Sequence, residues 1–320
     1  IRFYYPVFMV MFLRYGITLE QFGLLNAVWA VVIVLLEVPS GALADLLGRK
    51  SLLVTAAIMM TLEMLLLAIV PIGSSWVFPA LLLNRILSGA AEAFASGADE
   101  ALAFDSLKAA GKDADWPRVL ERLMQVGGLA TIVAMVTGSL VYSPDLIQQV
   151  VIWFGSTIQL TIDDTFRLPV WLTLFSGCGA IFVTLSMKEL SPDRSGRSIG
   201  IIDPFKQTLQ TGYWILANPL VLIVIAAGVL FDQPIRQLLV VSSQLYTRIE
   251  IPVLYFGIIS AGTAVIGLLA ATPMRRLATS QSPRANFILL FCAVTLGLFG
   301  TGLLIPWWGV GFFMLSLIHI

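Results

Sequence analysis

Charged residues are scarce in this sequence. Of its 320 residues, 12% are charged and 58% are hydrophobic, whereas an ordinary soluble domain carries roughly 25% charged residues. The formal net charge is zero, so no nucleic-acid partner is indicated. A soluble chain of this composition would have too little polar surface to cover itself, and the scarcity of charge therefore excludes an ordinary soluble domain.

Histidine and cysteine are rarer still. The only histidine is His319, and the two cysteines, Cys178 and Cys292, both lie inside apolar segments. These residues cannot supply a zinc site of the usual type, so neither a metal nor a cofactor is expected. We interpret the cysteines as small buried hydrophobes rather than as a disulfide. The sequence also lacks an HExxH motif and a G-x-x-x-x-G-K-[ST] phosphate loop, which argues against an enzyme and against direct ATP drive.

Long apolar runs are abundant instead, for example over 22–36, 221–231 and 287–318. A bilayer-spanning helix needs about 20 mostly apolar residues, and the sequence predicts an all-α integral membrane protein. Ten spans are predicted, near 1–14, 20–43, 51–71, 77–104, 119–142, 167–187, 218–246, 252–273, 286–305 and 306–320. The chain begins and ends inside apolar sequence without an initiator Met, and truncation at both ends is expected.

Two stretches between these spans are not membrane-like. We predict a loop with an amphipathic patch over 143–166 and a polar linker over 188–217. Because cytoplasmic loops carry an excess of Lys and Arg, the basic residues orient the chain. Alternate loops carry thirteen of them, against three on the opposite loops: Arg14, Arg167 and Arg248. This asymmetry predicts a cytoplasmic linker between an N-terminal six-helix bundle over 1–187, its first helix partial, and an incomplete C-terminal bundle over 218–320.

The two predicted bundles share a faint internal repeat. Phe22-Gly23 opens the second span and Phe256-Gly257 opens the eighth, and each glycine is followed sixteen residues later by a proline, Pro39 or Pro273. At the same separation, Arg2 in the first span corresponds to Arg236 in the seventh. Both halves are therefore predicted to enter the membrane in the same sense, as parallel repeats do in transporters.

Two motifs carry a resemblance to a known family. The segment Gly41-Ala-Leu-Ala-Asp-Leu-Leu-Gly-Arg-Lys50 is similar to the signature loop G-x-L-x-D-R-x-G-R-R/K of the major facilitator superfamily, although Leu46 stands where the family usually has Arg. Arg85-Ile-Leu-Ser-Gly-Ala-Ala-Glu92 resembles the family's pattern R-x-x-q-G-x-g-a in span four. The chain thus resembles a bacterial-type member of this superfamily, with about ten of its twelve helices present in two bundles.

The resemblance implies a secondary active transporter. Such a protein is a multi-pass monomer of the cytoplasmic (inner) membrane that moves a small-molecule substrate by alternating access. The resemblance also implies a conformational latch that holds the outward-facing state, in which Arg49 pairs with an acid at the end of span four. The latch residues are Gly41, Asp45, Gly48, Arg49 and Asp105. The alternative is that Arg49 and Lys50 are simply cytoplasmic anchors.

Charges inside the predicted spans are the candidates for a substrate or proton pathway, because each costs about 2.5–3.5 kcal/mol at a helix centre. Spacings of seven place Arg85, Glu92 and Asp99 on one stripe of a helix over 77–104. Arg85 and Glu92 could instead form a structural pair. The other candidates are Glu63 in span three, Arg2 in span one, and Asp232 and Arg236 on either side of Pro234 in span seven.

Proton coupling is a hypothesis that Glu63, Glu92 and Asp99 motivate, although Glu63 could equally hydrogen-bond while neutral. The sign of the substrate's charge stays open, because arginines favour an anion and acids favour a cation. A transporter-like sensor or partner-binding protein without net transport is the alternative function. The departure at Leu46, and the second-half counterpart of the signature loop, Pro273-Met-Arg-Arg276, which lacks the acid, leave that alternative open.

Overall fold

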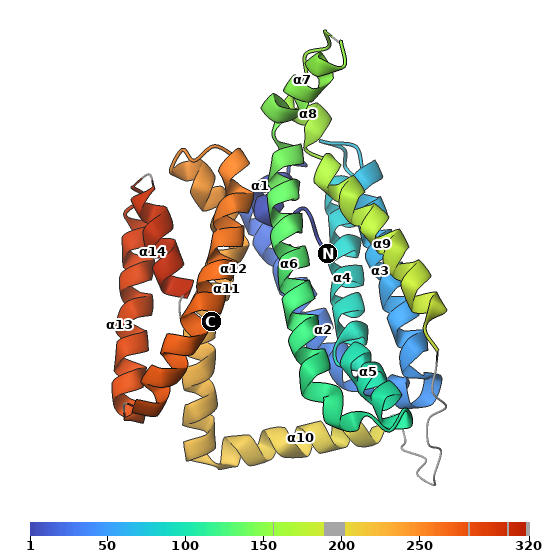
Figure 1. Ribbon diagram of the computed structural model, residues 1–320, viewed down its shortest axis with the longest axis vertical. Coiled ribbons are helices and arrows are strands. Elements are labelled where there is room, and N and C mark those ends of the chain that lie inside the picture. The colour runs from blue at the N-terminus through green and yellow to red at the C-terminus, as the bar shows by residue number, and fades with distance from the viewer. Residues whose placement is uncertain (156, 189–201, 281, 306, 318–320) are drawn as a thin grey trace. The chain divides into compact units, whose positions relative to one another are not determined.

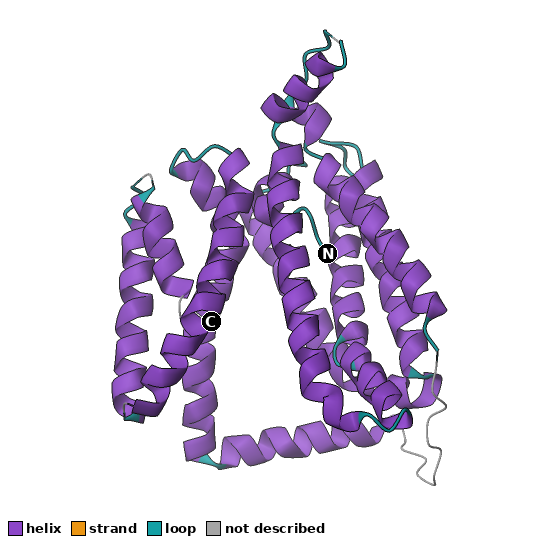
Figure 2. Ribbon diagram, viewed as in Figure 1, coloured by secondary structure: helices purple, strands orange, loops and turns teal. Residues whose placement is uncertain are grey.

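Helices form the whole regular structure of the part of the chain described by the computed structural model, residues 1–155, 157–188, 202–280, 282–305 and 307–317 (Figures 1 and 2). The elements are η1 (Tyr5–Val7), α1 (Phe8–Arg14), α2 (Leu19–Leu47), α3 (Arg49–Ile69), α4 (Val77–Ala95), α5 (Ala98–Ala109), η2 (Asp113–Asp115), α6 (Trp116–Tyr142), α7 (Pro144–Trp153), α8 (Ile162–Thr165), α9 (Leu168–Ser186), α10 (Ile202–Ala217), α11 (Pro219–Arg248), α12 (Leu254–Ser280), α13 (Pro283–Gly302) and α14 (Trp308–Leu317). The all-α prediction is confirmed.

Six of the helical segments are long and apolar enough to cross a membrane. They are Leu19–Gly41, Arg49–Ile69, Val77–Ala109, Asp113–Tyr142, Ile162–Ser186 and Pro219–Arg248. Three shorter apolar helices are Tyr5–Arg14, Leu254–Ile266 and Ile288–Gly302. Together with α14, these segments account for the ten predicted spans, with ends that differ by a few residues.

Two helices contain a proline and continue beyond their predicted ends at 43 and 273. α2 passes Pro39 and ends at Leu47, and α12 passes Pro273 and ends at Ser280. Proline removes one hydrogen bond to the preceding turn, but its carbonyl and the residues after it can still continue a helix. In α2, Ser40 adds a local bond, because its hydroxyl donates to the carbonyl of Glu37 at 2.7 Å.

The predicted single helix over 77–104 is wrong, because the chain breaks between α4 and α5. Ser96 caps α4 with φ −54° and ψ 114°, and Gly97 has φ 71°. A left-handed glycine after the last turn is a frequent way to end a helix. The break separates the residues before Ser96 from the twelve residues of α5.

The predicted loop over 143–166 is also partly wrong, since it contains α7 and α8. Pro144 stands in the first turn of α7, where its missing N–H costs no helical bond. Gln148 of α7 binds the chain before α8, because its amide donates to the Ile158 carbonyl at 2.8 Å and accepts from the Leu160 N–H at 2.6 Å. In the predicted linker, 202–217 form α10, and 189–201 lie outside the described residues.

Backbone contacts divide the chain into two compact units. The first unit consists of Ile1–Met11, Gly127–Pro169 and Val224–Ile320. The second unit consists of Phe12–Val126 and Val170–Ile223. This division differs from the predicted bundles 1–187 and 218–320, which stay a prediction. Each unit is described by itself.

In the second unit, α4 packs against both α2 and α3. Glycine allows the close approach to α2, because a Cβ on Gly89 would lie 2.8 Å from the backbone oxygen of Trp29. At Gly177 of α9, a Cβ would lie 2.8 Å from the Thr61 hydroxyl of α3. These small residues therefore bring helices together, as small residues at membrane-helix interfaces do.

In the first unit, helices far apart in the sequence meet. η1 contacts α12, and α14 packs against α12 and α13. A Cβ on Gly257 of α12 would overlap the backbone oxygen of Met135 in α6, and one on Gly138 would overlap the backbone of Phe3. Glycine at these two positions is thus required by contact between backbones.

The predicted repeat is visible in the local structure. The rings of Phe12 and Phe22 lie 5.8 Å apart in a T-shaped contact, and their repeat counterparts Tyr246 and Phe256 lie 5.1 Å apart in another. The turns after the first helix of each repeat also agree. Gly16 has φ 98° and donates its N–H to the carbonyl three residues before it, and Glu250 has φ 59° and does the same.

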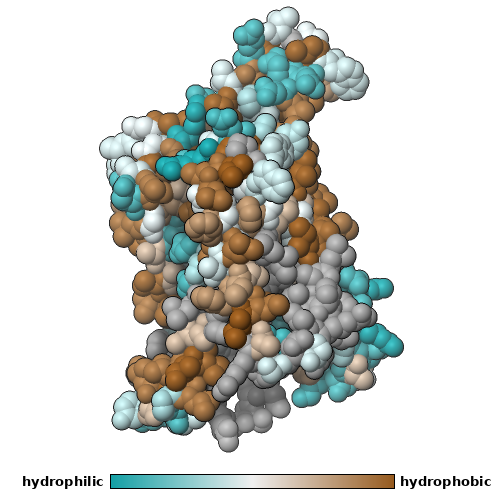
Figure 3. All heavy atoms as spheres, turned by 90° about the vertical axis from the view of Figure 1, so that its left-hand side faces the viewer, coloured by the Kyte–Doolittle hydropathy of each residue, from teal (hydrophilic) through white to brown (hydrophobic). Residues whose placement is uncertain are grey.

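Much of the solvent-accessible surface is hydrophobic, as Figure 3 shows for one face. Exposed examples include Val34 of α2, Phe182 of α9 and Phe299 of α13. Large apolar side chains on the outside of long helices suit contact with lipid. The prediction that Cys178 and Cys292 are buried is wrong: both are free and exposed, on the outer faces of α9 and α13.

Candidate functional site

A one-residue turn joins α2 to α3 in the segment that resembles the signature loop. Gly48 has φ 91° and ψ 146°, a conformation that side chains strongly disfavour. α3 begins directly after it, at Arg49, and the Gly48 N–H still bonds to the carbonyl of Ala44. The glycine therefore reverses the chain sharply and places Arg49 at the first position of a helix.

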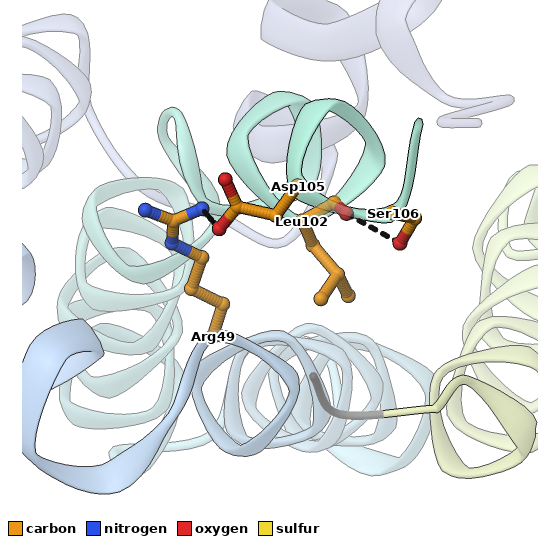
Figure 4. A network of polar contacts seen from close by, with 4 residues as sticks. All are labelled: Arg49, Leu102, Asp105 and Ser106. Carbon is orange, nitrogen blue, oxygen red and sulfur yellow. Dashed lines mark hydrogen bonds and ion pairs between the residues drawn. The ribbon is translucent and has the colours of Figure 1, made fainter. Parts of the chain in front are cut away.

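Arg49 forms an ion pair with Asp105 of α5, as predicted (Figure 4). The two side chains are 30% and 44% exposed, so solvent weakens the pair and its contribution to stability is small. α5 is also held by Leu102, which packs in a small core with Leu53 and Ala98. The ion pair and this core attach α5 to α3.

The other predicted latch residues lie elsewhere in α2. Gly41 is an exposed residue within the helix and not part of a turn. Asp45 stands in the last turn of α2, and its side chain lies outside those that the structure describes. The prediction that all the glycines of the motif permit the turn therefore holds for Gly48 alone.

A cavity of about 340 Å³ lies among α2, α3, α4 and α5, with Arg49 in its wall. Small side chains make most of the lining, which explains why space is left there. The lining residues are Ser40, Gly41, Ala44, Arg49, Leu52, Phe94, Ser96, Gly97, Ala98 and Ala101. The Ser96 hydroxyl also donates to the Glu37 carboxylate at 3.4 Å, which links the α4–α5 break to α2.

A buried polar cluster connects α3 and α4. The Asn84 amide donates to the backbone carbonyl of Glu63 at 2.8 Å, and Arg85 Nε donates to Asn84 Oδ1 at 2.9 Å. The guanidinium carbon of Arg85 lies 5.1 Å from the centroid of the Phe12 ring, within reach of a cation–π interaction. Glu63, Asn84 and Arg85 are all at most 3% exposed.

Two ionisable residues therefore belong to one buried cluster, Glu63 on α3 and Arg85 on α4, and the bond that joins the two helices reaches the backbone carbonyl of Glu63. The hydrogen bond to Asn84 and the Phe12 ring offset part of the cost of burying the Arg85 charge. Sequence reasoning singled out both charges but missed Asn84. The signal was available, because a polar amide directly before a membrane-embedded arginine calls for an explanation of its own.

The predicted stripe of Arg85, Glu92 and Asp99 is not continuous. Arg85 is buried and Glu92 is exposed on α4, whereas Asp99 lies in α5 beyond the break at Gly97. Asp99 is exposed in the first turn of α5, and its carboxylate accepts the Glu100 N–H at 2.8 Å. The heptad spacing fails because the helix it assumes ends at Ala95.

The remaining candidates lie in the other unit. Arg2 donates to the Tyr4 hydroxyl at 3.4 Å, and its guanidinium carbon lies 5.6 Å from the Tyr5 ring centroid. Arg236 is exposed on α11, which continues through Pro234. The side chain of Asp232 lies outside those described, so the pairing predicted for it with Arg236 stays a prediction.

No protein-family model and no curated protein sequence matches the chain. Among solved structures, it is similar to a partially occluded, inward-open conformation of the xylose transporter XylE from E. coli, with a TM-score of 0.58 and 15% identity. The similarity covers 93% of this chain and 72% of that one. The chain thus has the fold of that transporter structure, and the six long apolar helices among its described residues support a multi-pass membrane protein.

Proposed function

We propose that this protein is a secondary active transporter that moves a small solute across the cytoplasmic membrane by alternating access. The observation that carries the proposal is the fold, which the chain shares with a xylose transporter over 93% of its length. In this proposal the bundles 1–187 and 218–320 move against each other, and the linker 188–217 lies on the cytoplasmic side, where the excess of Lys and Arg places it.

The buried cluster of Glu63, Asn84 and Arg85 supports a transport pathway rather than a purely apolar packing core. Charged side chains inside membrane spans are rare and are mostly functional. We assign the pathway to Arg85, Glu63 and Glu92 in one unit, together with Arg2, Arg236 and Asp232 in the other. Asp99 belongs to the cytoplasmic end of this pathway, because it lies on α5 beyond the break.

The first solute to test is D-xylose, because the similar structure is that of a xylose transporter. Amide and guanidinium groups such as those of Asn84 and Arg85 can donate hydrogen bonds to sugar hydroxyls as well as to anions. A neutral polyhydroxylated solute also agrees with a set of candidate residues that includes both signs of charge.

The proposal is tested by uptake in proteoliposomes that contain the full-length protein, with D-xylose first and a panel of neutral, anionic and cationic solutes after it. Accumulation driven by an imposed proton gradient would establish proton-coupled transport, and we expect Glu63→Gln or Glu92→Gln to reduce it at least tenfold. Uptake without proton movement would make the protein a uniporter. Binding without flux for any solute would contradict the proposal and favour a sensor.

The Arg49–Asp105 pair is proposed as the latch of this cycle. It joins the α2–α3 turn to α5, and the neighbouring cavity of about 340 Å³ leaves space for α5 to change position when the pair opens. We expect Arg49→Asp and Asp105→Arg each to slow transport severalfold, and the double variant to recover most of the loss because the pair is restored in reverse. Equal rates in the single and double variants would show that Arg49 is only an anchor.

A further inference from the structure

The hydroxyl of Ser243 binds the start of a helix in the other half of the sequence. Ser243 Oγ accepts the backbone N–H of Met9 at 3.1 Å and that of Val10 at 3.2 Å. Ser243 is 1% exposed and Met9 is 2% exposed. The contact is therefore a dry one within a single unit, between α1 and α11.

These two N–H groups belong to the first turn of α1, where a helix leaves its N–H groups without partners inside the helix. Such groups are usually bound by a side chain of the residue that precedes the helix. Here the chain before α1 forms η1, which contains Pro6 and whose cap residue Tyr4 makes no side-chain cap. The cap of α1 comes instead from Ser243 of α11, which is 234 residues away.

The same separation of 234 residues relates the two repeats. It pairs Phe12 with Tyr246 and Phe22 with Phe256, whose ring contacts are alike. Met9 and Ser243 are therefore repeat counterparts that touch each other.

We infer that Ser243 is a positioning residue that couples the first turn of α1 to the position of α11. When α11 lies close, the serine hydroxyl completes the start of α1. When α11 moves away, two buried N–H groups lose their acceptor, and the first turn of α1 loosens. The inference rests on the proposed alternating access, because that cycle requires the two repeats to separate on one side of the membrane.

The predicted orientation of the chain assigns this contact to the non-cytoplasmic side. Met9 and Ser243 each lie five residues before the end of their helix, at Arg14 and Arg248, and the predicted orientation places both ends on the non-cytoplasmic side. A second contact in the same unit lies near the start of α12, where the Ser139 hydroxyl of α6 donates to the carbonyl of Leu254 at 3.3 Å. The accessibility of Ser139 therefore reports independently on whether the helices of this unit are closed together on that side.

The first measurement is hydrogen–deuterium exchange of the segment 5–14 in the full-length protein. We expect Ser243→Ala to accelerate exchange there roughly tenfold, because two hydrogen bonds are lost. The matched control is Ser242→Ala, since the Ser242 hydroxyl donates within its own helix, to the carbonyl of Leu239 at 2.8 Å. Equal exchange in the two variants would overturn the inference.

A pair of variants of nearly equal shape, Ser243→Thr and Ser243→Val, controls for a general loss of folding. Thr and Val have nearly the same shape, but only Thr retains the acceptor oxygen. We expect Ser243→Thr to keep the protection of 5–14 and Ser243→Val to lose it. If both variants behave alike, the hydroxyl is not the coupling group, and the inference is wrong whatever Ser243→Ala shows.

The second measurement uses the accessibility of position 139 to follow whether the helices are closed together on the non-cytoplasmic side. In a background of Cys178→Ser and Cys292→Ser, a Ser139→Cys substitution is labelled with a membrane-impermeant maleimide from the non-cytoplasmic side. We expect Ser243→Val to increase the labelling rate roughly tenfold over Ser243→Thr. An unchanged rate would overturn the coupling. Neither measurement requires a substrate, so an absence of flux for every solute of the panel alongside these changes would reject the proposed transport and leave the coupling of α1 to α11 supported.

Discussion

The two repeats are built alike where the first helix turns into the second, and differently where the second turns into the third. In both, an aromatic pair packs in a T-shaped contact, and a residue with positive φ closes the turn, Gly16 in one and Glu250 in the other. The shared feature is a packing requirement. Each repeat must bury its aromatic pair, and the turn that brings the two helices together has the same geometry in each.

The second turns differ in what stabilises them. In the first repeat, Gly48 alone joins α2 to α3, and Arg49 pairs with Asp105. In the second, α12 ends at Ser280, and the Ser282 hydroxyl caps α13 by accepting the Ala285 N–H at 3.3 Å. An ordinary side-chain cap thus stands where the first repeat has a glycine with positive φ and an ion pair. The comparison supports a latch specific to the first repeat.

The largest effect expected from this comparison concerns the counterpart glycines Gly23 and Gly257. A Cβ on Gly257 would overlap the backbone of Met135, whereas one on Gly23 would meet nothing within 4 Å. We expect Gly257→Ala to lower the free energy of unfolding by about 3 kcal/mol. Gly23→Ala should leave it unchanged or slightly raised, because alanine favours a helix. Thermal unfolding in detergent measures both, and similar melting temperatures would contradict the close approach of α6 and α12.

A smaller effect is expected at Asn84, whose cluster rests on Phe12 of the first repeat's aromatic pair. Asn84→Ala would leave the Arg85 Nε–H and the Glu63 carbonyl without the bonds described, at a cost of about 2 kcal/mol. The control is Asn26→Ala, because the Asn26 amide donates only to a carbonyl of its own helix, that of Phe22 at 2.9 Å. Equal losses of stability would show that Asn84 does not join α3 to α4.

The smallest effect tests the turn that the repeats share. Glu250 has a left-handed conformation that glycine adopts without strain, so Glu250→Gly should stabilise the protein by about 1 kcal/mol. Gly16→Ala should destabilise it by about the same amount, since no neighbouring atom lies within 4 Å of a Cβ there and only the backbone is strained. Thermal unfolding of the two variants, measured side by side, checks that their stabilities change in opposite directions. Changes in melting temperature of the same sign would reject the equivalence of the two turns.

Most helices could be predicted because a membrane span is a local property. About 20 apolar residues in a row are sufficient to indicate one, whatever its neighbours are. The helix ends that were predicted wrongly depend on single residues instead. Pro273 was expected to end a helix that continues past it, and Gly97 ends a helix that was expected to continue. A proline or glycine is compatible with either outcome, and packing around it decides which one occurs.

The candidate site was predictable to different degrees. The Arg49–Asp105 pair followed from the resemblance to a known motif, and the buried charges followed from the cost of charge in a membrane. The heptad stripe through Asp99 failed because it assumed an unbroken helix. Asn84 could have been singled out from its place beside Arg85, but its partner could not, because the Glu63 carbonyl that its amide binds lies twenty-one residues earlier on another helix.

The sequence by itself determined that this is a multi-pass helical membrane protein and which charges require an explanation, because hydropathy and the cost of buried charge act residue by residue. Only the tertiary structure decided that α4 stops before Asp99, that Asn84 joins α3 to α4, and that Ser243 caps a helix 234 residues away. Those outcomes depend on which backbones approach each other, and an approach of that kind leaves no trace in the spacing of residues along the chain.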